Sequence, residues 1–195
     1  MFCWSALWTI VLLLLPLILI SWTDLLRQYE NWKVMLDADH SSSLGISVMG
    51  WLQAWFNLAP NKMVVLFFGM IALIIPLFFV KLYSVSRFQI LMLSSVLLWV
   101  ILFNHKSESP TFIIALAGIA IWYFTQKPAY LNTILIVLAF VFTGLIATDI
   151  FPRTIRKEWA EPYLIKVVPC ILIWIKICWD LMILWMRAKR SMRQI

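Results

Sequence analysis

The sequence predicts an all-α protein, a polytopic membrane helix bundle with about six spanning helices and two short interfacial helices. Hydrophobic residues make up 64% of the 195 positions, and the mean hydropathy is +0.93. A soluble domain contains roughly 45–50% apolar residues. The apolar residues also fall in long uninterrupted runs with basic residues at their flanks, as in membrane proteins. Lipid offers the backbone no hydrogen bonds, so such runs favour helices.

Six apolar runs approach the roughly 20 residues that a helix needs to cross a bilayer. Proline lies inside three of them, where kinks are tolerated. We therefore expect one membrane domain, 1–195, with an outer segment at 22–62, a basic tail at 187–195, and spans at about 2–21, 63–80, 88–104, 110–126, 130–148 and 164–186.

The first run does not resemble a cleaved signal peptide. Residues 1–5 contain no basic residue, and the apolar stretch 6–20 is followed by Ser-Trp-Thr-Asp rather than by a small-residue cleavage site. We expect this run to stay in the membrane. The lack of positive charge before it suggests that the chain is the tail of something longer.

The outer segment 22–62 has a helical pattern of its own. Ser21 and Asp24 are spaced as a capping box, and apolar residues follow at helical spacing. A second apolar stripe runs from Leu44 to Trp55. Two short tryptophan-anchored helices in the membrane interface fit this pattern. A helical hairpin packed on the bundle fits it equally well, and the two are compatible.

Lysine and arginine placement predicts the orientation. With six spans both termini share one side, and by basic count alone the two sides tie. The dense basic tail next to the last span breaks the tie. We therefore expect a multi-pass protein of the inner (plasma) membrane with both termini in the cytoplasm. This orientation places eight of the nine acidic residues outside: Asp24, Glu30, Asp37, Asp39, Glu108, Asp149, Glu158 and Glu161.

The outer loops also hold cations suited to a lipid phosphate. Arginine and lysine donate charge-assisted hydrogen bonds to phosphate oxygens. The candidate substrate-binding residues are His40, Lys106, Arg153 and Arg156. The alternative is that these are solvated loop charges of little consequence. The basic residues form no continuous patch, so the net charge of +7 does not indicate a nucleic-acid partner.

The loop "FNHKSESPTF" at 103–112 is the candidate catalytic element. His105 and Glu108 stand three residues apart in it. A histidine exchanges protons near neutral pH, and a nearby carboxylate orients it or acts as the base. The alternative is a solvated turn between two spans. The sequence contains no His-x-x-His ligand pair, so we expect no metal site.

The last predicted span contains ionisable residues, which are costly in a membrane. Lys176 and Asp180 are four residues apart on one helical face, a spacing that lets them pair. We favour a structural pair over a proton or ion relay. Lys166, at the outer end of this span, is expected to reach the interface.

Three stretches resemble a known family: "DHSSSLGISVMGWLQAW", "ILFNHKSESPTFIIALAGIAIWY" and "TDIFPRTIRKEWAEPYLIKVVPCILIWIKI". Together they are similar to the C-terminal half of the polyprenol-phosphate-mannose-dependent mannosyltransferases, glycosyltransferase family 87, in a Bacteroidetes-type branch. The resemblance covers most of the chain. It implies the C-type glycosyltransferase fold and sugar transfer from a polyprenyl-phosphate donor to an acceptor outside the membrane, a glycan or a lipid, with no further cofactor.

The resemblance also implies positions for the candidate residues. His105 and Glu108 would lie near the donor or acceptor, and Lys106, Arg153 and Arg156 would face the lipid phosphate. Family members are about twice as long, and their catalytic aspartate lies in an N-terminal half that this sequence lacks. We therefore expect a membrane glycosyltransferase, or a C-terminal fragment inactive without that missing half. The alternatives are a small transporter, with Lys176 and Asp180 lining its path, and a non-catalytic membrane subunit.

Overall fold

The computed structural model describes residues 2–38, 44–58 and 60–191, and this part of the chain is helical with no strand. The predicted all-α class is therefore confirmed. The residues group into two compact units, Met1–Ser42 and Ser43–Ile195. Each unit is described by itself, and the single membrane domain expected from the sequence stays a prediction.

The first unit is a pair of helices with a sharp bend between them. Helix α1 (Phe2–Leu14) continues as the 3₁₀ turn Leu15–Ile18, which Pro16 starts, and α2 spans Trp22–Ala38. The chain direction bends by 117° between Ala6–Ile18 and Trp22–Met35. The Ser21 hydroxyl accepts a hydrogen bond from the Asp24 amide at 3.2 Å and lies 2.7 Å from its carboxylate, so the predicted cap is confirmed. The predicted span 2–21 is corrected at its end, because the chain has already turned after Ile18.

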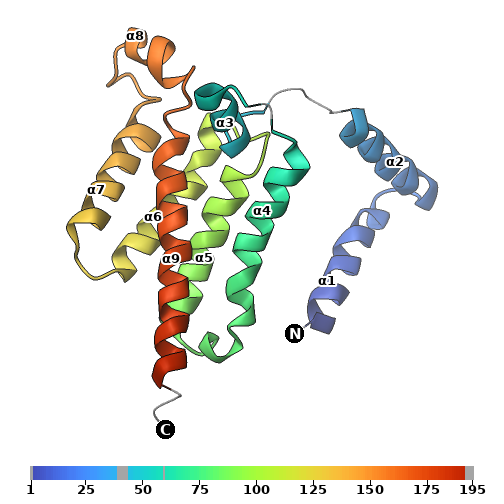
Figure 1. Ribbon diagram of the computed structural model, residues 1–195. Coiled ribbons are helices and arrows are strands. Elements are labelled where there is room, and N and C mark those ends of the chain that lie inside the picture. Colours follow the sequence, from blue (N-terminus) through green and yellow to red (C-terminus); the bar gives the residue numbers. More distant parts are fainter. Residues whose placement is uncertain (1, 39–43, 59, 192–195) are drawn as a thin grey trace. The chain divides into compact units, whose positions relative to one another are not determined.

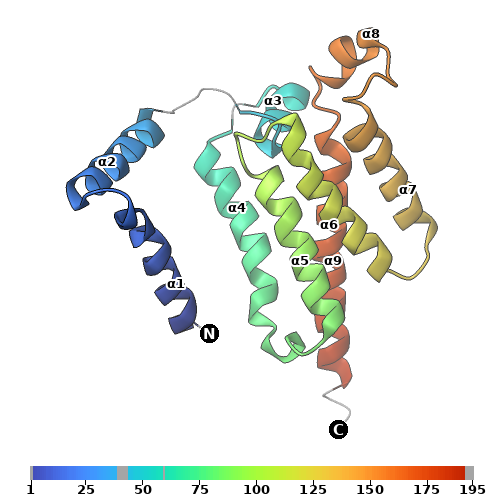
Figure 2. The same ribbon diagram turned by 180° about the vertical axis from the view of Figure 1, so that it is seen from behind.

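The second unit is a helix bundle built around α5 (Ser86–Leu102), α6 (Phe112–Thr125) and α9 (Val167–Ser191). Helix α5 packs against both α6 and α9, while α4 (Lys62–Ile74) and α7 (Tyr130–Ala139) lie on the flanks (Figures 1 and 2). The buried core gathers at the centre of this bundle and includes Leu98, Ile119, Trp122, Ile173 and Ile177.

The two ends of this bundle collect different loops. At one end lie α3 (Val48–Phe56), the α5–α6 loop and α8 (Arg153–Ile155) with the π-helical turn Arg156–Ala160 (Figure 1). At the opposite end lie the turn after α4, the α6–α7 loop and the C-terminal end of α9. At this end the Arg87 guanidinium, in the first turn of α5, donates a hydrogen bond of 2.9 Å to the side-chain oxygen of Gln126. This bond joins the start of α5 to the α6–α7 loop. The loops therefore alternate between the ends, as the sequence predicts.

Several helices are interrupted where the chain cannot continue the α-helical pattern. Pro76 lacks an amide hydrogen, and α4 gives way there to the 3₁₀ turn Ile75–Phe78. Helix α7 loosens into the π-helical segment Phe140–Leu145. Residues 161–166 form turns, so α9 starts at Val167 rather than near 164.

The apolar helices differ in whether they are long enough to cross a membrane. Among the described residues, the helix Val167–Arg190 is long and apolar enough to cross one, and a second span is counted if the bent pair Ala6–Ile18 and Trp22–Met35 is taken as one. The shorter apolar helices are Lys62–Phe78, Ser86–Leu102, Ser109–Thr125 and Tyr130–Leu145. Seventeen residues reach about 25 Å, below the roughly 30 Å of a bilayer core. Helices thus occupy the predicted runs, but the six-span count is not confirmed.

Candidate functional site

The α5–α6 loop, which contains the predicted catalytic residues, is held in shape by its own backbone. The Asn104 carbonyl accepts from the Ser107 amide at 3.1 Å, and its side-chain oxygen accepts from the Lys106 amide at 3.0 Å. The Glu108 carbonyl accepts from the Thr111 amide at 3.1 Å and from the Thr111 hydroxyl at 2.7 Å. The loop is therefore a folded turn that leads directly into α6.

The segment before α3 packs against this loop at a glycine. Gly45 has φ +56°, and a Cβ built on it would lie 2.1 Å from the His105 carbonyl oxygen. Next to it, the Ile46 amide donates to the Ser107 carbonyl at 3.2 Å, and the buried Ser107 hydroxyl donates to the Ile101 carbonyl at 2.7 Å. Two segments about sixty residues apart in sequence thus form one backbone-paired unit at the end of the bundle.

Lys166, immediately before α9, is the buried cation of this end of the bundle. Its side chain is 8% exposed, and its ammonium donates to the Ser109 carbonyl at 2.9 Å and to the Ser109 hydroxyl at 2.7 Å. It also lies 5.0 Å from the centre of the Phe112 ring. Burial lowers the pKa of Lys166 from its ordinary value, because desolvation disfavours the ammonium form. No carboxylate is bonded to this amine among the ion pairs of the described residues.

Arg156 reaches the same place from the π-helical turn after α8. Its guanidinium donates to the Ala147 carbonyl at 3.4 Å and lies 3.9 Å from the Glu161 carboxylate and 4.0 Å from that of Asp149. Both carboxylates are largely exposed, so these long contacts hold the guanidinium only weakly. Arg156 is therefore a partly buried cation with donors left over for a ligand.

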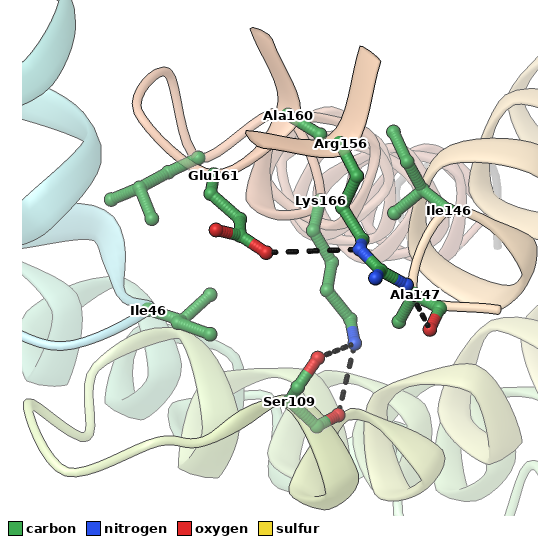
Figure 3. Close-up of a pocket in the computed structure, with 9 residues that line it drawn as sticks. Ile46, Ser109, Ile146, Ala147, Arg156, Ala160, Glu161 and Lys166 are labelled. Atoms are coloured by element: carbon green, nitrogen blue, oxygen red, sulfur yellow. Dashed lines mark hydrogen bonds and ion pairs between the residues drawn. The ribbon is translucent and has the colours of Figure 1, made fainter. Parts of the chain in front are cut away.

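A cavity of about 70 Å³ lies between these groups, with Ser109, Arg156, Glu161 and Lys166 as its polar residues (Figure 3). A second cavity of about 290 Å³ adjoins it and shares Ser109, Ala147 and Lys166. The rest of the second lining is mostly apolar and comes from α6 and the α7 end, including Phe112, Leu116 and Gly144. Lys166 thus lines both cavities; the first also contains Arg156 and Glu161, and most of the remaining lining of each cavity is apolar.

The structure places the predicted site residues unevenly. Arg156 lines the polar cavity, whereas His105, Lys106, Glu108 and Arg153 are not among its lining residues. Lys106, Glu108 and Arg153 are exposed, and His105 is half-buried. His40 lies outside the described residues. The structure therefore brings one predicted cation to the cavity and leaves the His105–Glu108 pair on the neighbouring loop.

Three polar lining residues were missed or misread from the sequence. Ser109 and Glu161 were not singled out as ligands. Lys166 was expected to reach the membrane interface, whereas its amine is bonded to Ser109 beside the Phe112 ring and the residue is only 8% exposed. A lone lysine among apolar residues, as in "YLIKVVPC", is a signal for a functional cation. Its Ser109 partner is 57 residues away and carries no such signal.

The ionisable pair of α9 forms as predicted. The Lys176 ammonium binds the Asp180 carboxylate, whose second oxygen accepts from the buried Trp122 indole at 3.5 Å. Asp180 is 8% exposed. The i,i+4 pairing is confirmed, and the extra bond to Trp122 on α6 gives it a structural role in joining two helices.

Comparison with known proteins finds no matching family model, no matching curated protein and no matching solved structure. The fold and the site define a helical bundle in which two cations, Arg156 and Lys166, line one cavity and Lys166 also lines a second. The resemblance to glycosyltransferase family 87 stays a prediction.

Proposed function

We propose that this chain is a multi-pass membrane protein that binds the phosphate of a polyprenyl-phosphate-linked sugar at the α3–α8 end of its bundle. We propose further that it acts in transfer of that sugar, as a glycosyltransferase or as the C-terminal part of one. The observation that carries the proposal is the cavity that Arg156 and the buried Lys166 line together, with a second, larger cavity of mainly apolar lining that shares Lys166.

The two cavities suit the two parts of a lipid phosphate. Phosphate oxygens accept charge-assisted hydrogen bonds from an ammonium and a guanidinium. The adjoining lining of Phe112, Ile113 and Leu116 is apolar, as the first units of a polyprenyl chain require. Inorganic phosphate would occupy only the first cavity and leave the second one empty. The pair of cavities therefore favours a lipid-linked ligand.

Membrane insertion is supported by the apolar surface. Large apolar side chains are exposed along the helices, for example Leu19 at 88% and Met63 and Phe78 at 77%. Exposed apolar surface of this extent on a water-soluble chain favours association. Lipid removes that cost and also accounts for the 64% hydrophobic composition.

In the proposed transfer the acceptor hydroxyl oxygen bonds to the anomeric carbon, and the bond from that carbon to the phosphate oxygen breaks. Polyprenyl phosphate leaves with the bonding electrons, and Arg156 and Lys166 stabilise its developing charge. The hydroxyl proton passes to a carboxylate base. The sequence nominates Glu108 beside His105 for this role, and Glu161 is the carboxylate that lines the cavity. His40, Lys106 and Arg153 remain proposed substrate contacts.

Transport is the less supported alternative. It would use Lys176 and Asp180 as a relay, yet these groups bind each other and Trp122. A non-catalytic subunit would also retain the cavity and bind the ligand. Binding and transfer therefore need separate measurements.

The binding experiment uses the full chain in lipid nanodiscs with undecaprenyl phosphate as the probe, and with undecaprenol and inorganic phosphate as comparisons. We expect undecaprenyl phosphate to bind at least tenfold more tightly than either. Lys166→Met and Arg156→Gln are each expected to weaken it by at least about tenfold, because each removes a charge-assisted contact worth roughly 1.5–3 kcal/mol. Lys157→Gln, which removes an exposed cation next to Arg156, is the matched control. Equal binding of undecaprenol, or equal loss in the control, would contradict the proposal.

Transfer is then assayed as release of undecaprenyl phosphate from its mannosyl derivative in membranes that supply acceptors. Loss of release in Glu108→Gln with binding intact supports the sequence-based assignment of the base. Loss in Glu161→Gln alone assigns the base to Glu161. Binding without transfer in the wild type supports a subunit role instead.

A further inference from the structure

Another hollow, separate from the two cavities of the candidate site, lies at the opposite end of the bundle. It measures about 370 Å³ and lies between the turn after α4 and the C-terminal end of α9. Phe79 and Trp185 form part of its wall, Lys81 and Lys189 supply its charge, and the exposed Phe78 and Val80 continue it. The function proposed above makes no use of this hollow.

The hollow follows from the proline break in α4. Because Pro76 ends the α-helix, the chain folds into two tight 3₁₀ turns, Ile75–Phe78 and Val80–Leu82. The second turn holds the Phe79 ring stacked on that of Trp185, with centroids 4.9 Å apart and planes at 11°. The Lys189 ammonium lies over the Trp185 ring at 5.1 Å. Two aromatic rings thus hold the turn against α9 and place a lysine at its rim.

The charged side chains around this hollow, within the part of the chain that the structure describes, are all basic. Lys81, Arg187, Lys189 and Arg190 belong to the elements that form it or continue it, and all are exposed. The sequence contains no acidic residue between Asp39 and Glu108 and none after Asp180. The C-terminus of α9 contributes about −0.5 of a charge, which these four cations outweigh. The electrostatic balance favours an anion.

We propose that this hollow binds the headgroup of an anionic membrane phospholipid. Lys81 and Lys189 contact the phosphate, Trp185 and Phe79 lie at the glycerol level, and the acyl chains run along Phe78 and Val80. Basic pockets beside the aromatic residues of helix ends are suited to such headgroups. This inference rests on the membrane insertion proposed above but not on sugar transfer.

The test titrates the detergent-solubilised full chain with phosphatidylglycerol and with phosphatidylcholine, and counts bound lipids by native mass spectrometry. We expect saturable binding of phosphatidylglycerol, at least tenfold tighter than of phosphatidylcholine. Each lysine near a lipid surface contributes on the order of fivefold, so Lys81→Gln/Lys189→Gln should lose most of this preference. Lys81→Arg/Lys189→Arg, which retains both charges, should bind like the wild type.

The matched control is Lys33→Gln/Lys157→Gln, which removes the same charge from exposed positions outside the hollow. Equal loss in both glutamine pairs, or no lipid preference in the wild type, would overturn the inference while leaving membrane insertion intact. Circular dichroism checks that each variant is folded, and Lys189→Gln alone serves if the double variant is not. A chain that stays soluble without detergent and ignores vesicles would instead overturn the proposed membrane function.

Discussion

At the scale of single residues, Gly45 decides how the candidate catalytic loop is placed. Its positive φ and its approach to the His105 carbonyl both require the absence of a side chain. The backbone hydrogen bond from the neighbouring Ile46 amide to the Ser107 carbonyl then fixes how the segment before α3 aligns with the α5–α6 loop. His105 is thus positioned by a glycine rather than by bonds of its own ring.

Gly45→Ala is expected to lower the free energy of unfolding by more than about 2 kcal/mol. The left-handed conformation alone costs an alanine roughly 1–2 kcal/mol, and overlap with the His105 carbonyl adds to it. The matched control is Gly144→Ala, whose Cβ would meet Leu116 at an ordinary 3.8 Å. Thermal or chemical unfolding in detergent, followed by circular dichroism, measures both. Similar small effects of the two substitutions would show that the Gly45 contact is not tight in solution.

Lys166 predicts a pH dependence of stability. Its folded-state pKa lies below its ordinary value of 10.5, so between these two values the unfolded chain binds more protons than the folded one. The free energy of unfolding therefore rises with pH in this window and levels off above 10.5. In Lys166→Met this contribution is absent, so the wild type should gain stability relative to the variant as the pH rises from the lowered folded-state pKa toward 10.5. Parallel unfolding curves for the two proteins across that range would contradict the assignment.

At the scale of elements, α9 is joined to its neighbours by polar as well as apolar contacts. The Trp174 indole donates to the buried Ser95 hydroxyl on α5 at 3.1 Å, and Asp180 accepts from Trp122 on α6. The Lys166 carbonyl accepts from the buried Thr143 hydroxyl at 2.8 Å, within the π-helical segment after α7. These bonds fix the rotation of α9, which apolar packing alone specifies less strictly.

Substitutions of Lys176 and Asp180 test how much their ion pair contributes to stability. Asp180→Ala leaves the Lys176 ammonium and the Trp122 indole without their acceptor, and we expect a loss of about 3 kcal/mol of unfolding free energy. The double variant Lys176→Met/Asp180→Leu replaces the pair by apolar residues and should lose less. Unfolding of the two variants in the same detergent measures the difference. If the double variant is as unstable as the single one, packing rather than an unpaired charge explains the loss.

At the scale of the whole molecule, the arrangement of the loops predicts which end of the bundle faces each side of the membrane. In the unit Ser43–Ile195, the α5–α6 loop and the turn after α8 lie at one end of the bundle, and the turn after α4 and the α6–α7 loop lie at the other (Figures 1 and 2). Residues 105 and 157 belong to the first pair of segments, and residues 81 and 127 to the second. If the bundle spans the inner membrane as proposed, each pair faces one side. The basic tail predicts that the end with residue 105 faces outward.

Single cysteines introduced in a background with Cys3, Cys170 and Cys178 replaced by alanine test this orientation. An impermeant maleimide added to intact cells should label His105→Cys and Lys157→Cys, and should label Lys81→Cys and Lys127→Cys only after lysis. Labelling of position 105 only from the inside would reverse the orientation and remove the extracytoplasmic sugar-transfer proposal. Labelling of both pairs before lysis would contradict a spanning bundle.

The sequence by itself predicted the helical class, because in lipid a long apolar run can satisfy its backbone hydrogen bonds within the segment only as a helix. It also placed an apolar helix in each predicted run, although α4 and α7 end at Ile74 and Ala139, before the expected 80 and 148. The Ser21 cap and the Lys176–Asp180 pair were predicted correctly, since both depend on local spacing. Proline positions indicated where α1 and α4 give way to 3₁₀ turns.

Only the tertiary structure decided which polar residues meet. Arg156, Lys166 and Ser109 come from three separate segments, and no local pattern states that the Lys166 amine turns inward to Ser109 rather than outward to the interface. The π-helical turn that carries Arg156 is likewise set by packing rather than by composition. The physical reason is that helix formation depends on neighbours along the chain, whereas a cavity depends on the distance in space between residues far apart in sequence.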